Sequence, residues 1–364
     1  MISLADPQFG DEEIEAVRSI LEDGMVADGP EVRRFESSFA EYCGADHAVG
    51  VANGTAALHA ALEGLGIGDG DRVVTTPLSF VASANAIRLA GATPVFADVD
   101  PHTYNLDPDA ARRAVRETNA DAILAVHLYG LPAEMDAFQE IATDEDVFLV
   151  EDAAQAHGAR YRGEPVGSFG DAAAFSFYPT KNMTTGEGGM VLTNDEEVAE
   201  RAASYVNHGR TGDGTYAHAR LGHNYRMTSI AAAMGRVQLE RLPEWVESRR
   251  ANARRLTEGL EDVPGIEPPT EPTTRDHAYH QYTVRCENRD ELRERLADDG
   301  IGSGVYYPTT IHQLGAYEGY DDVTPIAERA TEEVLSLPVH PTLTDGDLER
   351  IVEAVEETMR RIPS

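Results

Sequence analysis

Short apolar runs that alternate with helical segments are the feature that most limits what this chain can fold into. The runs are almost purely apolar, as expected for strands that are buried on both faces of a sheet. They are RVVTTP (72–77), PVFADVD (94–100), DAILAVH (121–127), DVFLVED (146–152) and DAAAFSF (171–177). One helical pattern precedes them, at 54–66, and two fall between them, near 107–117 and 133–142. This alternation predicts an α/β fold with a mostly parallel sheet covered by helices.

The pattern changes in the last third of the chain. A charged helix predicted over about 246–260 leads into the proline-rich segment PGIEPPTEPTT, and shorter strand and helix patterns follow. We therefore divide the chain near residue 245. Residues 1–245 form a large domain that includes an N-terminal helix, and residues 246–364 form a small α+β C-terminal domain.

The charge of the chain excludes several classes of partner. Asp and Glu outnumber Lys and Arg by 64 to 30, which gives a formal net charge of −34 and argues against binding to nucleic acid or to an anionic membrane. An excess of carboxylates with almost no lysine is the composition expected of a halophilic protein, since concentrated salt screens the repulsion. An ordinary acidic protein explains the charge but not the scarcity of lysine.

The two cysteines, Cys43 and Cys286, lie far apart in the sequence and match neither a disulfide framework nor a metal-binding spacing. The N-terminus shows no signal-peptide pattern, and no apolar run is long enough to span a membrane. We expect a cytoplasmic protein without a metal site.

Three features could contribute to a ligand site, and ligands bind in such folds at the carboxyl ends of the strands. Asp152 ends a predicted strand, where its carboxylate could hold a cationic ring nitrogen or simply cap the next turn. The segment ANGTAAL (52–58) opens a helix whose N–H groups could bind a phosphate, or Asn53 or Thr55 could be an ordinary N-cap there. Ser176 offers a further hydroxyl group.

Lys181 is the only lysine in the 364 residues. Arginine serves every other basic position, but arginine does not deprotonate in proteins, whereas a lysine amine can attack a carbonyl carbon. Lysine is therefore retained where a nucleophilic amine is needed. Together with a strand-end carboxylate and a phosphate-binding helix, it indicates a pyridoxal phosphate (PLP) site.

Nearly the whole chain resembles the DegT/DnrJ/EryC1/StrS family of nucleotide-sugar aminotransferases. The matching motifs include VHLYGLPAEMD (126–136), EDAAQAHGA (151–159), FSFYPTKNMTTGEGG (175–189), GHNYRM (222–227) and GVYYPTTIH (304–312). Further matches are NGTAAL, SFVASANAI (79–87) and LSLPVHP (335–341). The resemblance implies fold type I of the PLP-dependent transferases, the fold class of aspartate aminotransferase, and a homodimer with shared active sites.

The resemblance also implies roles for individual residues. Lys181 forms the Schiff base with the cofactor and carries the proton, Asp152 pairs with the pyridinium nitrogen, and Gln155 bonds the ring hydroxyl. The other cofactor residues that it implies are Phe80 and Ala154 on the two ring faces, with Gly54, Thr55, Ser176 and the partner subunit's Asn224 at the phosphate. Tyr306, His312 and His340 fall in stretches that lie near the sugar in the family.

The predicted activity is transfer of an amino group, with L-glutamate as the expected donor, to a keto-sugar carried by a nucleotide diphosphate, as in polysaccharide or glycan biosynthesis. Two alternatives stay open. One is a PLP-binding regulatory protein without turnover, and the other is a different fold type I enzyme such as a lyase. The sequence leaves open the nucleotide, the sugar and the position of its ketone.

Overall fold

The computed structural model describes residues 1–212, 216–320 and 323–361. Its centre is a seven-stranded sheet in the order β1-β9-β8-β5-β4-β2-β3. The strands are β1 (His47–Val51), β2 (Arg72–Thr75), β3 (Thr93–Phe96), β4 (Ala122–Val126), β5 (Phe148–Asp152), β8 (Ala172–Ser176) and β9 (Gly189–Thr193). The five from β8 to β3 are parallel, which confirms the predicted α/β class and the mostly parallel sheet.

Two strands at one edge of this sheet were not predicted. β9 pairs antiparallel with both β8 and β1. Every residue of β9 is buried, so its sequence GMVLT shows no alternation and follows a glycine-rich turn that obscures its start. A short apolar run without periodicity does not reveal strand direction.

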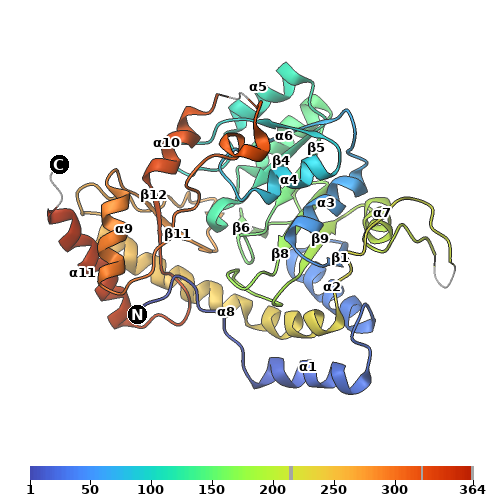
Figure 1. Ribbon diagram of the computed structural model, residues 1–364, viewed down its shortest axis with the longest axis horizontal. Helices are drawn as coiled ribbons and strands as arrows, with labels where there is room; N and C mark the ends of the chain where they lie inside the picture. The colour runs from blue at the N-terminus through green and yellow to red at the C-terminus, as the bar shows by residue number, and fades with distance from the viewer. Residues whose placement is uncertain (213–215, 321–322, 362–364) are drawn as a thin grey trace.

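Helices cover both faces of the large sheet, and most of them connect successive strands (Figure 1). Val73, Leu124 and Val150 point to one face, where their core cluster includes side chains of α3 and α7. The neighbouring residues Val74, Ile123 and Leu149 point to the other face, toward α5 and α6, because side chains alternate along a strand. The helices of this part are α1 (Asp11–Asp23), α2 (Pro30–Cys43), α3 (Gly54–Leu65), α4 (Ala82–Leu89), α5 (Pro108–Thr118), α6 (Met135–Glu145), α7 (Glu196–Val206) and α8 (Ser229–Leu260).

The predicted start of the long charged helix, about residue 246, was wrong. Helix α8 runs without a break from Ser229 to Leu260 and passes through Pro243. A proline inside a helix removes one hydrogen bond, but α8 packs against both α1 and α2, and this contact stabilises it across the proline. The helix extends from the large sheet to the C-terminal part of the chain (Figure 1).

The C-terminal part has a core of its own, formed by residues between Ala253 and Val355 together with Ile2 from the start of the chain. Its elements are β11 (Tyr282–Arg285), β12 (Val334–Leu337), α9 (Arg289–Asp298), α10 (Pro325–Glu333) and α11 (Asp345–Arg361). The remaining short elements are β6 (Arg160–Tyr161), β7 (Glu164–Pro165), β10 (Arg275–Asp276), η1 (Leu128–Gly130), η2 (Ile311–Gln313) and η3 (Gly315–Tyr317). The domain boundary near residue 245 stays a prediction.

Candidate active site

A cleft of ≈ 890 Å³ lies at the carboxyl ends of β5 and β8, beside the N-terminus of α3. This is the edge of a parallel sheet where ligands are expected. The cofactor and sugar residues predicted from the sequence that line it are Gly54, Thr55, Phe80, Asp152, Ala154, Gln155, Ser176, Lys181 and Tyr306. The fold therefore brings nine of the twelve predicted site residues to one cavity.

Lys181 enters the cleft from the turn after β8. Its backbone N–H donates to the carbonyl oxygen of Tyr178 at 2.9 Å, which closes the turn that presents the side chain. Burial lowers the pKa of the Lys181 amine to about 8, although the negative charge of Asp152 acts in the opposite direction. A lowered pKa makes the neutral, nucleophilic amine available near neutral pH.

Asp152 is the last residue of β5 and is only 5% exposed. One carboxylate oxygen accepts a hydrogen bond from the Ser83 hydroxyl at 2.7 Å, and the other accepts one from the backbone N–H of Ala154 at 3.2 Å. Burial raises the pKa of Asp152 despite these bonds. Both donors are neutral, so the charge of this buried carboxylate is left for a cation in the cleft.

The N-terminus of α3 meets the end of β8 at very short range. A Cβ atom on Gly54 would lie 2.7 Å from the Cβ of Ser176, so only glycine fits there. The Asn53 side chain accepts from the N–H of Ala56 at 2.9 Å and so is the N-cap. The first N–H groups of a helix have no partner within the helix, so those of Gly54 and Thr55 stay available to an anion. The two interpretations of this segment, N-cap and phosphate site, are compatible.

Gln155 is held between two tyrosines. Its side-chain oxygen accepts from the backbone N–H of Tyr129 at 2.7 Å, and its side-chain nitrogen lies 3.1 Å from the hydroxyl of Tyr307. Phe80 is 56% exposed at the cleft, and its ring centroid lies 6.3 Å from that of Tyr307. An exposed aromatic ring at this place is suited to stack on a flat ligand.

The segment between α7 and α8 carries the remaining predicted cofactor residue. Asn224 is exposed and does not line the cleft of its own chain, whereas the next residue, Tyr225, does. Successive residues of an extended segment point to opposite sides. The described residues from 207 to 226 extend away from the C-terminal domain (Figure 1).

The three predicted sugar residues are placed differently. Tyr306 lines the cleft, but His312 and His340 are not among the described residues that do so. His312 packs against Phe96, with ring centroids 5.9 Å apart. His340 lies 3.0 Å from the backbone oxygen of Ser3. In this single chain, the two histidines are held by other contacts.

Ser83, Tyr307, Tyr225 and His59 also belong to the site and were not singled out from the sequence. The hydroxyl oxygens of Ser79 and Ser83 lie 2.9 Å apart, because the two residues are one turn apart. This four-residue spacing beside Phe80 is the sequence signal that could have identified Ser83 as a site residue. His59 lines the cleft from α3, one turn after the phosphate-binding residues. Tyr307 lies in the matched motif GVYYPTTIH, but its neighbour Tyr306 was the tyrosine singled out from that motif.

Neither cysteine is suited to catalysis. Cys43 and Cys286 are 2% and 1% exposed, and burial raises the pKa of both thiols. A buried, protonated thiol is a poor nucleophile. No cluster of three or more potential metal ligands occurs within residues 1–212, 216–320 and 323–361.

The donor set fits pyridoxal phosphate. Asp152 presents a buried carboxylate whose hydrogen-bond donors are both neutral, α3 presents free N–H groups beside a glycine that leaves room, and Lys181 presents an amine with a lowered pKa. These groups lie around one cleft on the type of fold that this cofactor class uses. Fold and site define a PLP-dependent aminotransferase.

Comparison with known proteins gives the family. Residues 7–356 match the sequence profile of the DegT/DnrJ/EryC1/StrS aminotransferase family, and the chain belongs to it. It is 43% identical to dTDP-3-amino-3,4,6-trideoxy-alpha-D-glucose transaminase of Streptomyces venezuelae, with 95% of this chain and 92% of that protein covered.

Solved structures agree with this assignment. The crystal structure of S. venezuelae DesV in complex with a ketimine intermediate has a TM-score of 0.93 and 42% identity, and covers 97% of this chain and 95% of that one. The PLP form of the putative sugar aminotransferase Spr1654 from Streptococcus pneumoniae has a TM-score of 0.93 at 28% identity, with both chains fully covered (100%). The predictions of fold class, aminotransferase activity and cofactor are confirmed.

Proposed function

We propose that the protein transfers an amino group from L-glutamate to a keto-sugar carried by a nucleotide diphosphate. The products are 2-oxoglutarate and the amino-sugar nucleotide. The observation that carries the proposal is the cleft of ≈ 890 Å³, in which Lys181 and Asp152 share a cavity large enough for a cofactor and a large second ligand. Relatives named as transaminases of a dTDP-linked amino sugar support the substrate class.

The bound cofactor supplies a ring that accepts electron density from the carbon that loses or gains a proton. The protein holds and tunes that ring. Asp152 keeps the ring nitrogen protonated, the N–H groups of Gly54 and Thr55 with the Ser176 hydroxyl hold the phosphate, and Gln155 bonds the ring hydroxyl. The Lys181 amine would bind the aldehyde carbon of the cofactor, and it would move the proton at the reacting carbon as general base and general acid.

The test is amino transfer itself. Purified enzyme is incubated with PLP, L-glutamate and a panel of 3-keto and 4-keto nucleotide sugars, and both 2-oxoglutarate and the amino-sugar are quantified. Release of 2-oxoglutarate in equal amount to one amino-sugar supports the proposal. Amino-sugar formation with L-glutamine but not L-glutamate contradicts the donor, and turnover with no member of the panel contradicts the substrate class.

We also propose a homodimer in which Asn224 of the partner subunit completes each phosphate site. Asn224 is exposed, and its segment extends away from the body of its own chain (Figure 1). Tyr178 and Phe80, at the cleft, are 49% and 56% exposed, and Leu221 on the extended segment is 93% exposed. A second copy that buries these apolar groups would also bring Asn224 to the phosphate.

Hybrid dimers test the shared site. Asn224→Ala should weaken PLP binding about tenfold or more, because a hydrogen bond to a charged acceptor is worth roughly 1.5–3 kcal/mol. A dimer of one Lys181→Ala and one Asn224→Ala subunit has one site with both substitutions and one with neither. Purified hybrids should recover one working site. Hybrids no more active than either parent would show that Asn224 acts within its own chain.

The net charge of −34 leads us to propose adaptation to a salt-rich cytoplasm. No helix within the described ranges is both long and apolar enough to cross a membrane. The Debye length grows from about 3 Å in 1 M salt to about 30 Å in 0.01 M salt, so dilution exposes the carboxylates to one another. The melting temperature should fall on this dilution. An unchanged melting temperature would argue against the adaptation.

A further inference from the structure

The side-chain amide of Gln155 has a fixed orientation in the cleft. Its oxygen lies 2.7 Å from the backbone nitrogen of Tyr129, and a backbone N–H can only donate. The atom nearest to Tyr129 must therefore be the oxygen, and the NH₂ group must lie on the other side. This contact determines where the two amide hydrogens of Gln155 are.

One of these hydrogens is used by Tyr307. The nitrogen of Gln155 donates to the Tyr307 hydroxyl oxygen at 3.1 Å, across 152 positions of sequence. Both residues line the cleft beside Phe80. The bonds at the oxygen and at the nitrogen together prevent the amide from rotating, so the second N–H has a single direction.

Tyr307 is supplied by the C-terminal part of the chain. The segment that carries it is fixed to β12 by two backbone hydrogen bonds between Gly304 and Ser336, at 3.1 and 2.8 Å. The segment also contacts the large domain, because the hydroxyl of Tyr129, which follows β4, donates to the backbone oxygen of Tyr306. Tyr129 thus contacts Gln155 through its backbone and the Tyr307 segment through its side chain.

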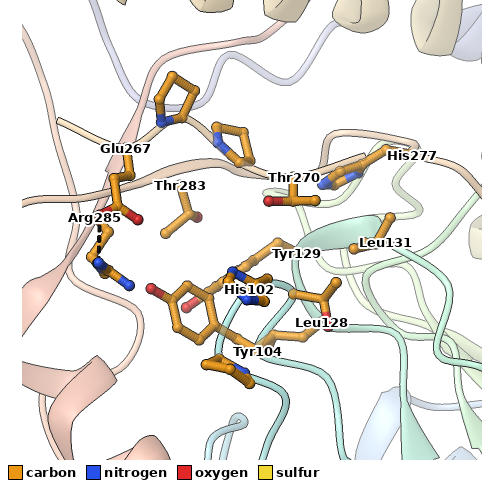
Figure 2. A pocket seen from close by; sticks show the side chains of 14 residues that line it. His102, Tyr104, Leu128, Tyr129, Leu131, Glu267, Thr270, His277, Thr283 and Arg285 are labelled. Atoms are coloured by element: carbon orange, nitrogen blue, oxygen red, sulfur yellow. Dashed lines mark hydrogen bonds and ion pairs between the residues drawn. The ribbon is translucent and has the colours of Figure 1, made fainter. Parts of the chain in front are cut away.

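Figure 2 shows Tyr129 from a second cavity. It is lined by residues 101–104, Leu128, Tyr129, Leu131, residues 267–270, His277, Thr283 and Arg285. Tyr104 lies in that cavity with its hydroxyl directed toward Arg285. This tyrosine is 9% exposed and lies between the same two parts of the chain. It is not among the described residues that line the active-site cleft, which makes it a matched control for Tyr307.

We propose that Tyr307 is a positioning residue that holds the Gln155 amide so that its second N–H donates to the ring oxygen of the cofactor. The inference rests on the proposed contact between Gln155 and that oxygen. Burial raises the pKa of the Tyr307 hydroxyl, so it stays neutral and cannot compete as an anion for the cofactor's cationic groups. Through this bond the C-terminal domain affects the electronic state of the cofactor.

The proposal has a spectroscopic consequence. In the holoenzyme, the ring oxygen of the cofactor would share a proton with the nitrogen of Lys181, and loss of that proton would change the visible absorbance. A donor that stabilises the negative ring oxygen weakens its hold on the proton and lowers the pH midpoint. Loss of a correctly aimed donor should therefore raise the midpoint by about one pH unit, the scale of a hydrogen bond to a charged atom.

The experiment titrates the visible absorbance of holoenzyme between acid and alkaline pH for wild type, Tyr307→Phe, Gln155→Leu, the double variant and the control Tyr104→Phe. We expect both single variants to raise the midpoint, the double variant to match Gln155→Leu, and the control to match wild type. Tyr307→Met, which also lacks the hydroxyl, replaces Tyr307→Phe if that variant does not fold. PLP affinity measured on the apoenzyme is a second readout and should fall in both single variants.

The outcomes separate the two proposals. An unchanged midpoint in Gln155→Leu would overturn the contact between Gln155 and the cofactor, and with it this inference. A shift in Gln155→Leu but not in the Tyr307 variants would overturn only the role of Tyr307. Additive shifts in the double variant would also overturn it, because a residue that acts through Gln155 has no effect once Gln155 is removed.

Discussion

Glu151 and Asp152 are neighbours in β5, but their side chains face opposite sides of the sheet in two different environments. Glu151 is fully buried and accepts hydrogen bonds from the His127 side chain at 3.0 Å and from the backbone N–H groups of Gly167, Phe169 and Gly170. Burial alone would raise the pKa of Glu151, but these bonds lower it overall. Asp152 has only two neutral donors, and burial raises its pKa.

The difference separates a structural carboxylate from a functional one. Glu151 has all the partners it needs within the fold, and it holds the 167–170 turn against the sheet. Asp152 is also buried, so its carboxylate loses its hydration as that of Glu151 does. However, neither of the two groups that donate hydrogen bonds to Asp152 carries a positive charge. Under the proposed function, the cofactor's protonated ring nitrogen would supply that positive charge.

The largest expected effect comes from the cation that faces Asp152. Lys181→Arg keeps a positive charge beside Asp152 but removes the amine that attacks a carbonyl and moves the proton. Amino transfer should fall by about 10³-fold or more, since a positioned acid–base group alone contributes 10²–10⁴-fold. Steady-state release of 2-oxoglutarate measures this, with circular dichroism as the control for folding. Activity near that of wild type would mean that charge alone is needed at this position.

Asp152→Asn should separate function from stability. The amide cannot hold a cationic ring nitrogen, and the rate should fall by about 10²–10³-fold, as for loss of one strong electrostatic contact in an active site. The apoenzyme should unfold at the same or a higher urea concentration, because the substitution removes the desolvation cost of a buried carboxylate whose hydrogen-bond donors are both neutral. A large loss of apoenzyme stability would instead place Asp152 with Glu151 as a structural residue.

Glu151→Gln should show the opposite pattern. Its NH₂ group would face backbone donors that now lack an acceptor, and each unsatisfied buried donor costs about 1–3 kcal/mol. The free energy of unfolding, from urea titration of the apoenzyme, should fall by at least that amount. The holoenzyme that remains folded should keep most of its rate per bound cofactor. A rate loss equal to that of Asp152→Asn, at unchanged stability, would contradict the comparison.

The smallest expected effect is on pH dependence. Under the proposed function Lys181 attacks the cofactor as the neutral amine, and its pKa is lowered to about 8 from the usual 10.5. The rate of PLP attachment to apoenzyme should therefore rise about tenfold per pH unit below that value and then level off. Asp152 opposes this shift, so Asp152→Asn should move the plateau to lower pH. A rate still rising at pH 10 would show an unperturbed lysine.

Much of this arrangement could be predicted from the sequence. The five parallel strands are continuous apolar runs, and Asp152 and Ser176 end two of them, so the ligand edge follows from the pattern. Lys181 is identifiable because it is the only lysine in the chain. The predicted roles of Asp152, Ser176 and Lys181 depend on the type of residue and on its position along a strand, and the local sequence shows both.

The remaining parts depend on contacts between distant segments. Tyr307 meets Gln155 across 152 positions, and neither local sequence indicates the pairing. The predicted start of the charged helix near residue 246 was too late, because packing of α8 against α1 and α2 stabilises it from Ser229 and across Pro243. His312 and His340 lie in motif stretches, yet their side chains contact Phe96 and Ser3 in this chain, so their role at the sugar stays a prediction.

The central claim is that Lys181, beside Asp152, is the nucleophile that bonds to the cofactor. Borohydride reduction of the holoenzyme, followed by peptide mapping, tests this claim most directly. Reduction makes the bond between the amine and the cofactor permanent. The other primary amine of the unmodified chain is that of Met1, so the assignment has two clear alternatives. We expect one pyridoxyl group per chain, on the peptide that contains Lys181. A pyridoxyl group at Met1, or a reduced protein without any, would contradict the account.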